Sequence, residues 1–186
     1  MSDNMSAATK ALASVVLPLT EHEARTATDA AMTSLRPDLS DRYRVIGTEL
    51  RIDKPPHERV PDRVVGVYVV DYREHRSIEA LVDSKGTVLA VNDLPPYQLP
   101  ISREELQEAQ SIAAQDEHLA RAVRRHQTAF VSPFAPHDHT SKKRVIGLHY
   151  FRPDKRHPQS PRPIGDVEVD LGAGTAVFTA IEVEDE

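Results

Sequence analysis

The sequence predicts an α+β protein built from two tandem units, each a helix packed on an antiparallel sheet. Three motifs recur roughly 80 residues apart in the same order, which two copies of one supersecondary unit explain better than chance does. The pairs are Pro18-Leu19-Thr20-x-x-Glu23 with Pro100-Ile101-Ser102-x-x-Glu105, Arg63-Val64-Val65-Gly66-Val67 with Arg144-Val145-Ile146-Gly147-Leu148, and Val82-Asp83 before Gly86-Thr87 with Val169-Asp170 before Gly174-Thr175.

The first unit is expected over residues 17–95, after a flexible tail of small and polar residues 1–16. A helix is predicted over residues 20–35, because Thr20 and Glu23 can form a capping box and alanines follow at helical spacing. Arg36-Pro37 ends it. Runs rich in β-branched residues, joined by short polar connections, predict antiparallel strands over residues 43–52, 64–72, 77–82 and 87–91.

The second unit is expected over residues 96–183, after a proline-rich junction. Ser102 and Glu105 form its capping box and open one long helix over residues 102–126. Strands are predicted over residues 128–131, 145–151, 166–170 and 176–183. A helix laid across one face of a curled antiparallel sheet is the arrangement of a cystatin, so we expect both units to be cystatin-like.

Polar residues at the strand ends have structural interpretations. Asp83 and Asp170 each precede a glycine turn, where we expect them to accept hydrogen bonds from backbone amides. Charged residues that flank the third predicted strand, Arg73, His75 and Glu79, are expected to lie on a solvated face. The sequence has no glycine-rich phosphate loop and no Gly-x-Ser-x-Gly motif, so neither nucleotide binding nor serine hydrolase chemistry is indicated.

Composition excludes several classes of function. The chain has no cysteine, which rules out disulfides, thiolate metal ligands and a cysteine nucleophile. No apolar run is long enough to span a membrane, and no secretory signal is evident, so we expect a cytoplasmic protein without membrane contact. Net charge is −6, yet residues 121–162 hold ten Lys or Arg against Asp138 and Asp154. Such a segment can attract a small anionic ligand or a protein partner, or it can be a solvated face that complements the acidic remainder. Nucleic acid is not expected, because no nucleic-acid-binding motif accompanies the basic segment.

Several segments also match a known family in order over residues 17–180. They are Leu17-Pro18-Leu19-Thr20-x-x-Glu23-Ala24, Tyr43-Arg44-Val45-Ile46-Gly47-Thr48-Glu49-Leu50, Ile78-Glu79-Ala80-Leu81-Val82-Asp83, Pro95-Pro96-Tyr97-Gln98-Leu99-Pro100-Ile101-Ser102-x-x-Glu105 and Arg162-Pro163-Ile164-Gly165-Asp166-Val167-Glu168-Val169-Asp170-Leu171. Together they resemble the non-catalytic amino-terminal region of copper-containing amine oxidases, specifically its tandem second and third domains.

The resemblance implies architecture and does not imply amine oxidase chemistry. In that family, the copper, its three histidines and the tyrosine-derived quinone belong to a large carboxyl-terminal β-sandwich, which residues 1–186 do not contain. None of the five tyrosines lies in the Asn-Tyr-Asp/Glu context from which the quinone forms: Tyr43, Tyr68, Tyr72, Tyr97 and Tyr150. We therefore expect no amine oxidase activity from this chain alone.

Histidines of the second unit are the remaining candidates for chemistry. His137-Asp138-His139 lies in a polar loop before the strand that carries His149, and these imidazoles could bind copper or zinc if the loop folds back. Alternatively, the loop is an exposed turn, and His149 fills the position that Tyr68 holds in the first repeat. For acid–base catalysis, the candidates are His126 and the pair His149 and Tyr150.

The leading function hypothesis is a non-catalytic binding or interaction module, because no strong catalytic constellation is present. One alternative is a small, metal-dependent enzyme of a biosynthetic pathway that uses the histidines of the second unit. Another is an accessory subunit of a separately encoded oxidase. Pairing as a homodimer is compatible with each of them.

Overall fold

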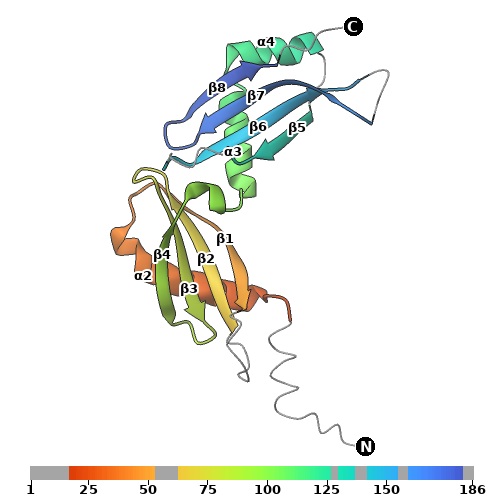
Figure 1. The fold of residues 1–186 in the computed structure, drawn as a ribbon. Coiled ribbons are helices and arrows are strands. Elements are labelled where there is room, and N and C mark those ends of the chain that lie inside the picture. Colours follow the sequence, from red (N-terminus) through yellow and green to blue (C-terminus); the bar gives the residue numbers. More distant parts are fainter. Residues whose placement is uncertain (1–16, 53–62, 127–129, 137–141, 155–158, 182–186) are drawn as a thin grey trace, which may run out of the picture. The chain divides into compact units, whose positions relative to one another are not determined.

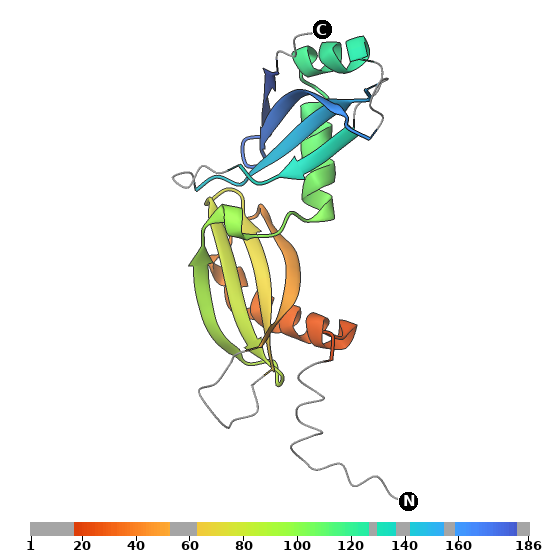
Figure 2. The same ribbon diagram turned by 45° about the vertical axis from the view of Figure 1, so that its right-hand side comes forward.

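The structure, a computed structural model, describes residues 17–52, 63–126, 130–136, 142–154 and 159–181. It is an α+β protein with two four-stranded antiparallel sheets, as Figures 1 and 2 show. The chain divides between Leu94 and Pro95 into two compact units. The predicted α+β class is therefore confirmed, and the predicted tail of residues 1–16 lies outside the described residues.

The first unit is a helix followed by a four-stranded meander, sheet A, whose strand order is β1-β2-β3-β4. Its elements are α2 (Glu21–Leu35), the 3-10 turn η1 (Arg36–Asp38), β1 (Tyr43–Ile52), β2 (Arg63–Asp71), β3 (Arg76–Asp83) and β4 (Val88–Leu94).

Helix α2 packs on one face of sheet A, and the capping box fixes where the helix begins. Thr20 N–H donates to Glu23 Oε2 at 2.8 Å, and Glu23 N–H donates to Thr20 Oγ1 at 3.2 Å. The helix buries Ala27, Ala31 and Leu35 against a row of strand residues, Val65, Val67, Val69, Ile78, Ala80 and Val82. Side chains alternate along a strand, so the residues between these core positions, such as Tyr68 and Glu79, point to the outer face of the sheet.

The second unit repeats this order with sheet B, whose strand order is β5-β6-β7-β8. Its elements are the 3-10 turn η2 (Pro96–Gln98), α3 (Arg103–Ala113), α4 (Glu117–His126), β5 (Phe130–Phe134), β6 (Val145–Arg152), β7 (Arg162–Asp170) and β8 (Thr175–Ala180). Figures 1 and 2 show α3 crossing behind sheet B. Among the described helices, none is long and apolar enough to cross a membrane.

The single helix expected over residues 102–126 is wrong, because the chain breaks between α3 and α4. Gln115 N–H donates to the Ile112 carbonyl at 3.1 Å and Asp116 N–H to the Ala113 carbonyl at 3.0 Å, so the last turn tightens and ends. Asp116 then starts a new helix by accepting from Leu119 N–H at 2.8 Å. The apolar stripe that suggested one helix thus spans two.

The predicted turns at the ends of β3 and β7 are confirmed. Asp83 Oδ1 accepts from the backbone amides of Lys85 at 2.9 Å and Thr87 at 2.8 Å, and these bonds hold the pKa of Asp83 below its usual range. Asp170 Oδ1 likewise accepts from Ala173 N–H at 2.9 Å. Gly86 and Gly174 adopt φ of 80° and 67°, the left-handed region that favours glycine.

Candidate functional site

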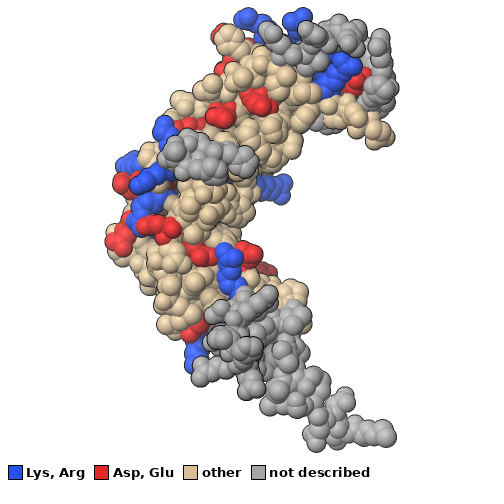
Figure 3. Space-filling view, viewed as in Figure 1, with Lys and Arg blue, Asp and Glu red and all other residues tan. Residues whose placement is uncertain are grey.

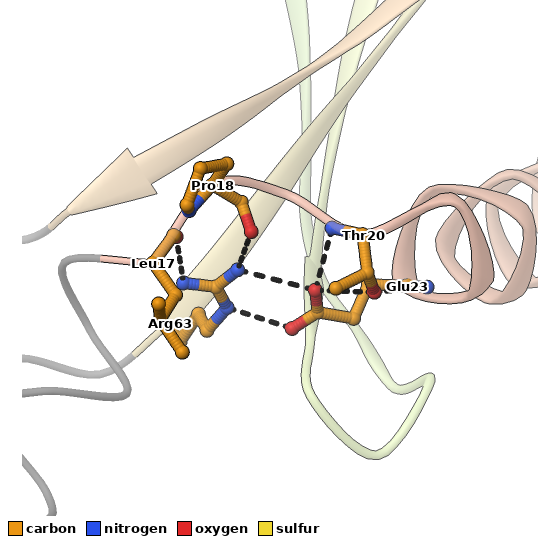
Figure 4. Close-up of polar contacts among 5 residues, drawn as sticks. All are labelled: Leu17, Pro18, Thr20, Glu23 and Arg63. Carbon is orange, nitrogen blue, oxygen red and sulfur yellow. Dashed lines mark hydrogen bonds and ion pairs between the residues drawn. The ribbon is translucent and has the colours of Figure 1, made fainter.

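Both units contain the same arginine arrangement, which we call the arginine clamp. In the first unit, Arg63 at the start of β2 reaches the carboxylate of the capping box, and Nε and Nη2 donate to Glu23 at 2.7 and 3.1 Å. The same guanidinium donates to the carbonyls of Leu17 at 2.8 Å and Pro18 at 2.9 Å, as Figure 4 shows. The clamp therefore ties the strand to the segment that leads into the helix.

The second unit repeats the clamp in a fully buried setting. Nε and Nη2 of Arg144 each donate to Glu105 at 2.9 Å, and the same side chain donates to the carbonyls of Pro96, Leu99 and Pro100. Arg144 is 4% exposed and Glu105 is fully buried. The polar residues that recur in the sequence thus build the scaffold, and a function must be sought where the two units differ.

A small pocket beside the clamp of the first unit does not provide that difference. It has a volume of about 70 Å³ and is lined by His22, Glu23, Thr26, Arg63 and Asp83, with Ala27, Val65 and Ser84. Since a cavity that binds benzene measures about 150 Å³, this pocket is too small to enclose an aromatic ligand. The polar atoms of Glu23 and Arg63 are moreover engaged with each other.

The outer faces of the two sheets carry equivalent polar pairs. Tyr68 on β2 lies opposite Glu79 on β3, and His149 on β6 lies opposite Asp166 on β7. Each aromatic residue comes two positions after a glycine of the repeated motif. The interpretation that His149 fills the position of Tyr68 is therefore confirmed.

In sheet A, the pair is closed off by its neighbours. Glu79 is only 7% exposed and accepts from Arg51 Nη2 at 2.8 Å, while Tyr68 donates its hydroxyl hydrogen to Glu49 at 2.9 Å. The Arg51 guanidinium lies over the Tyr68 ring. Burial, followed by the bond to Glu49, raises the pKa of Tyr68. The expectation that Glu79 faces solvent is wrong, because Arg51 reaches from β1 across β2 and covers it.

In sheet B, the equivalent pair is open to solvent. Nδ1 of His149 lies 2.7 Å from Oδ1 of Asp166, and the two side chains are 39% and 35% exposed. The Phe134 ring stacks on the imidazole at a centroid distance of 3.9 Å and an angle of 14°. Phe151 lies on β6 with its centroid 6.1 Å from that of His149. We call these four residues the sheet B site.

Gly147 leaves the space in which the Phe134 ring stacks on His149. Phe134 of β5 lies opposite Gly147 of β6, and a Cβ at Gly147 would overlap the Phe134 ring. In sheet A, the residue opposite the equivalent Gly66 is Glu49, which binds Tyr68 instead of stacking on it. The exchange of carboxylate for phenyl at this position is therefore one of the differences between the open and the closed pair, together with the Arg51 guanidinium that covers Glu79 in sheet A.

The contact with Asp166 decides which imidazole nitrogen is free to react. An ionised carboxylate accepts from Nδ1–H, so the neutral ring presents the lone pair of Nε2. Within the described residues, no hydrogen-bond partner is recorded for Nε2. The ring can therefore accept a hydrogen bond or a proton, or bind a metal, through Nε2.

Of the other predicted site residues, Tyr150 does not face the sheet B site. Tyr150 follows His149 on β6 and is buried, so it points to the opposite face of the strand, and burial raises the pKa of its hydroxyl. His126 is the last residue of α4, while His137 and His139 lie outside the described residues. Within the described part, no group of three His, Cys, Asp or Glu residues could hold a metal.

Sequence reasoning missed Phe134 and Asp166. The repeat carries a signal for Asp166, because it aligns with Glu79, but the register of the strands is needed to see the pair. Phe134 takes the position that Glu49 holds in the first unit, and the two residues differ in chemistry, so the repeat gives no signal for the aromatic ring.

Comparisons with known proteins add little. No family model matches the chain, and no curated protein matches it. Among solved structures, the chain is similar to the Bacillus megaterium YpeB C-terminal domain, with 13% sequence identity and a TM-score of 0.27. The match covers 91% of this chain and 69% of that one. A likeness at this TM-score carries neither fold nor function to this chain.

Proposed function

We propose that the chain is a non-catalytic binding module that contacts its partner through the sheet B site. The observation that carries this proposal is the solvent-accessible stack of Phe134 on His149. Aromatic residues are enriched at protein interfaces, where ring edges and faces bury large area at low entropic cost. The clamps and the Tyr68–Glu79 pair, in contrast, are engaged within the fold.

Exposure of the pair favours binding over catalysis. Acid–base enzymes exclude water around the reacting groups, because a dry site strengthens electrostatic interactions. His149 and Asp166 are both more than a third exposed, so water reaches both side chains. A partner that covers the rings would displace this water and could donate a hydrogen bond to Nε2 of His149.

The charge of the site favours a protein side chain over a small anion. Asp166 places a carboxylate 2.7 Å from the imidazole, and this charge repels a free anion that approaches the ring. A neutral aromatic or hydroxyl-bearing side chain meets no such repulsion and can donate to Nε2. We therefore favour a protein partner among the two ligand classes that the composition allows.

We further propose that both units are cystatin-like and resemble the amino-terminal domains of copper amine oxidases. The order of one helix region followed by a four-stranded antiparallel meander, present in each unit, supports this proposal. Under this proposal, a separately encoded oxidase is one candidate protein partner, for which the chain would serve as an accessory subunit.

A second candidate function is a small acid–base enzyme, which the His149–Asp166 contact favours. Asp166 would hold the imidazole in the tautomer that accepts a proton at Nε2. A metal-dependent version would need His137 and His139 to join His149, which remains a prediction.

An NMR titration of the isotope-labelled chain tests the proposed function, with N-acetyl-tyrosinamide as the neutral probe and benzoate as the anionic probe. We expect the neutral probe to shift the amide signals of β5, β6 and β7 around His149, and benzoate to shift them less. The variant His149→Ala should lose the response, while Leu89→Ala on β4, an exposed apolar position of sheet A, should keep it. Equal responses in both variants, or shifts confined to other elements, would refute the proposal.

A further inference from the structure

Helix α4 carries three exposed arginines on one side. Arg121, Arg124 and Arg125 are spaced three and four residues apart, so their side chains are neighbours on the helix surface. Leu119, only 2% exposed, anchors the opposite side of the helix in the second unit. Figure 3 shows Lys and Arg side chains standing out over the place that α4 occupies in Figure 1.

These arginines differ from three cations on or beside the strands of the same unit. Arg144 binds Glu105, Lys143 binds Asp170 at 3.1 Å, and Arg162 binds Asp154 at 2.7 Å. Within the described residues, no ion pair is recorded for the three arginines of α4. Glu117 precedes Arg121 by one turn, yet the structure records no bond between them. The α4 surface is therefore a concentration of positive charge without a described counter-charge.

The helix dipole explains only part of this arrangement. Cations near the carboxyl end of a helix interact favourably with its partial negative charge. That interaction stabilises the helix, but it leaves the guanidinium donors facing solvent. Each of the three guanidinium groups on this helix can bind a carboxylate through two parallel hydrogen bonds.

We propose that α4 is a docking surface for an acidic segment of a partner protein, with Arg121, Arg124 and Arg125 as its contacts. Charge complementarity supports this occupant, because successive carboxylates of an extended segment can face successive guanidinium groups. The whole chain has a net charge of −6, so an acidic segment is repelled by the protein on average and is favoured where positive charge is concentrated, as on α4.

Other anionic partners fit α4 less well. A helix that lies on a lipid surface inserts large apolar side chains, but α4 has no aromatic residue and its one leucine is buried. A nucleic acid would extend beyond one ten-residue helix onto the acidic surfaces of the molecule. Both partners are therefore included in the experiment as competing outcomes.

The experiment measures binding of a fluorescent deca-glutamate peptide to the full chain by anisotropy at low salt. The test variant replaces Arg121, Arg124 and Arg125 with Gln, which keeps helix propensity. The control variant replaces three exposed arginines that already have carboxylate partners, Arg25, Arg73 and Arg76, and so changes the net charge equally. We expect about tenfold weaker binding for the test variant, which corresponds to about 1.4 kcal/mol, and less than twofold for the control.

Several results would overturn the proposal. They are absence of peptide binding by the full chain, equal losses in both variants, binding only after residues 182–186 are removed, or tighter binding to single-stranded RNA or to phosphatidylserine vesicles than to the peptide. Circular dichroism spectra that match wild type establish that the variants are folded. Because α4 and the sheet B site share no residue, the titration at His149 and this experiment can fail independently.

Discussion

At the scale of single residues, the two arginine clamps make the same contacts but differ in how far they are buried. Arg63 is 12% exposed and Glu23 31%, whereas Arg144 and Glu105 are 4% and 0% exposed. A buried charge that loses its partner destabilises a protein far more than a half-exposed one, because water cannot replace the lost contact. The repeat therefore offers a matched comparison within one chain.

Replacing Arg144 with Met should destabilise the second unit by about 3–5 kcal/mol, because Glu105 would stay buried without a partner. Arg63→Met should cost less, roughly 1–2 kcal/mol, since Glu23 can turn to water. Amide hydrogen exchange at increasing urea concentrations measures the free energy of unfolding of each unit separately. Equal losses, or a larger loss for Arg63→Met, would show that burial does not govern the clamp.

Glu23 should give the first unit a distinct sensitivity to acid. Its bonds to Arg63 and Thr20 lower its pKa from 4.5 to about 2. Because the folded value lies below the unfolded one, this contribution to stability is complete above pH 4.5 and is lost as pH falls from 4.5 towards 2. We expect melting temperatures between pH 5 and 2 to fall less steeply for Glu23→Gln than for wild type. Parallel curves would mean that Glu23 is not responsible.

At the scale of elements, the pairing of β5 with β6 creates the open site, and Gly147 is the position that tests this. In Gly147→Ala, the new methyl group would displace the Phe134 ring from His149, at a cost of about 1–3 kcal/mol. Gly47→Ala is the control, because a Cβ there has nothing within 4 Å. We expect Gly147→Ala to lose the ring-current shifts of the His149 imidazole. Retention of these shifts would show that the stack does not depend on the glycine.

The sequence is informative about elements to the extent that local chemistry determines them. Both capping boxes and both glycine turns could be predicted, because each depends on residues within a few positions. The break at Asp116 could not, since the apolar stripe continues through it and the tightened turn has no local marker. His149 was a candidate from its position in the repeat. Its contacts with Phe134 and Asp166 depend on strand register, which a single sequence does not reveal.

At the scale of the whole molecule, the repeat distinguishes the structural contacts that both units share from the surfaces that we propose for binding. Features that both units share, the capping boxes and the clamps, hold each helix to its sheet. Features that only the second unit has, the Phe134–His149 stack and the arginines of α4, are the exposed ones.

The chain alone should show no oxidase activity on primary amines. None of its five tyrosines has the sequence context from which the amine oxidase quinone forms. We expect benzylamine or a similar amine to yield no hydrogen peroxide above background, with or without added copper. Peroxide production that depends on the purified chain would contradict this.

The most direct measurement is a crystallographic screen with neutral aromatic fragments, because the two sheets supply test site and control in one molecule. We expect fragments to occupy the sheet B site, in contact with Phe134, His149 and Phe151 and with a hydrogen bond to Nε2 of His149. The equivalent position at Tyr68 and Glu79, which is closed by its own hydrogen bonds, should stay empty. Fragments that bind both positions equally, or that leave the sheet B site empty while binding elsewhere, would contradict the proposal that this face is the binding surface.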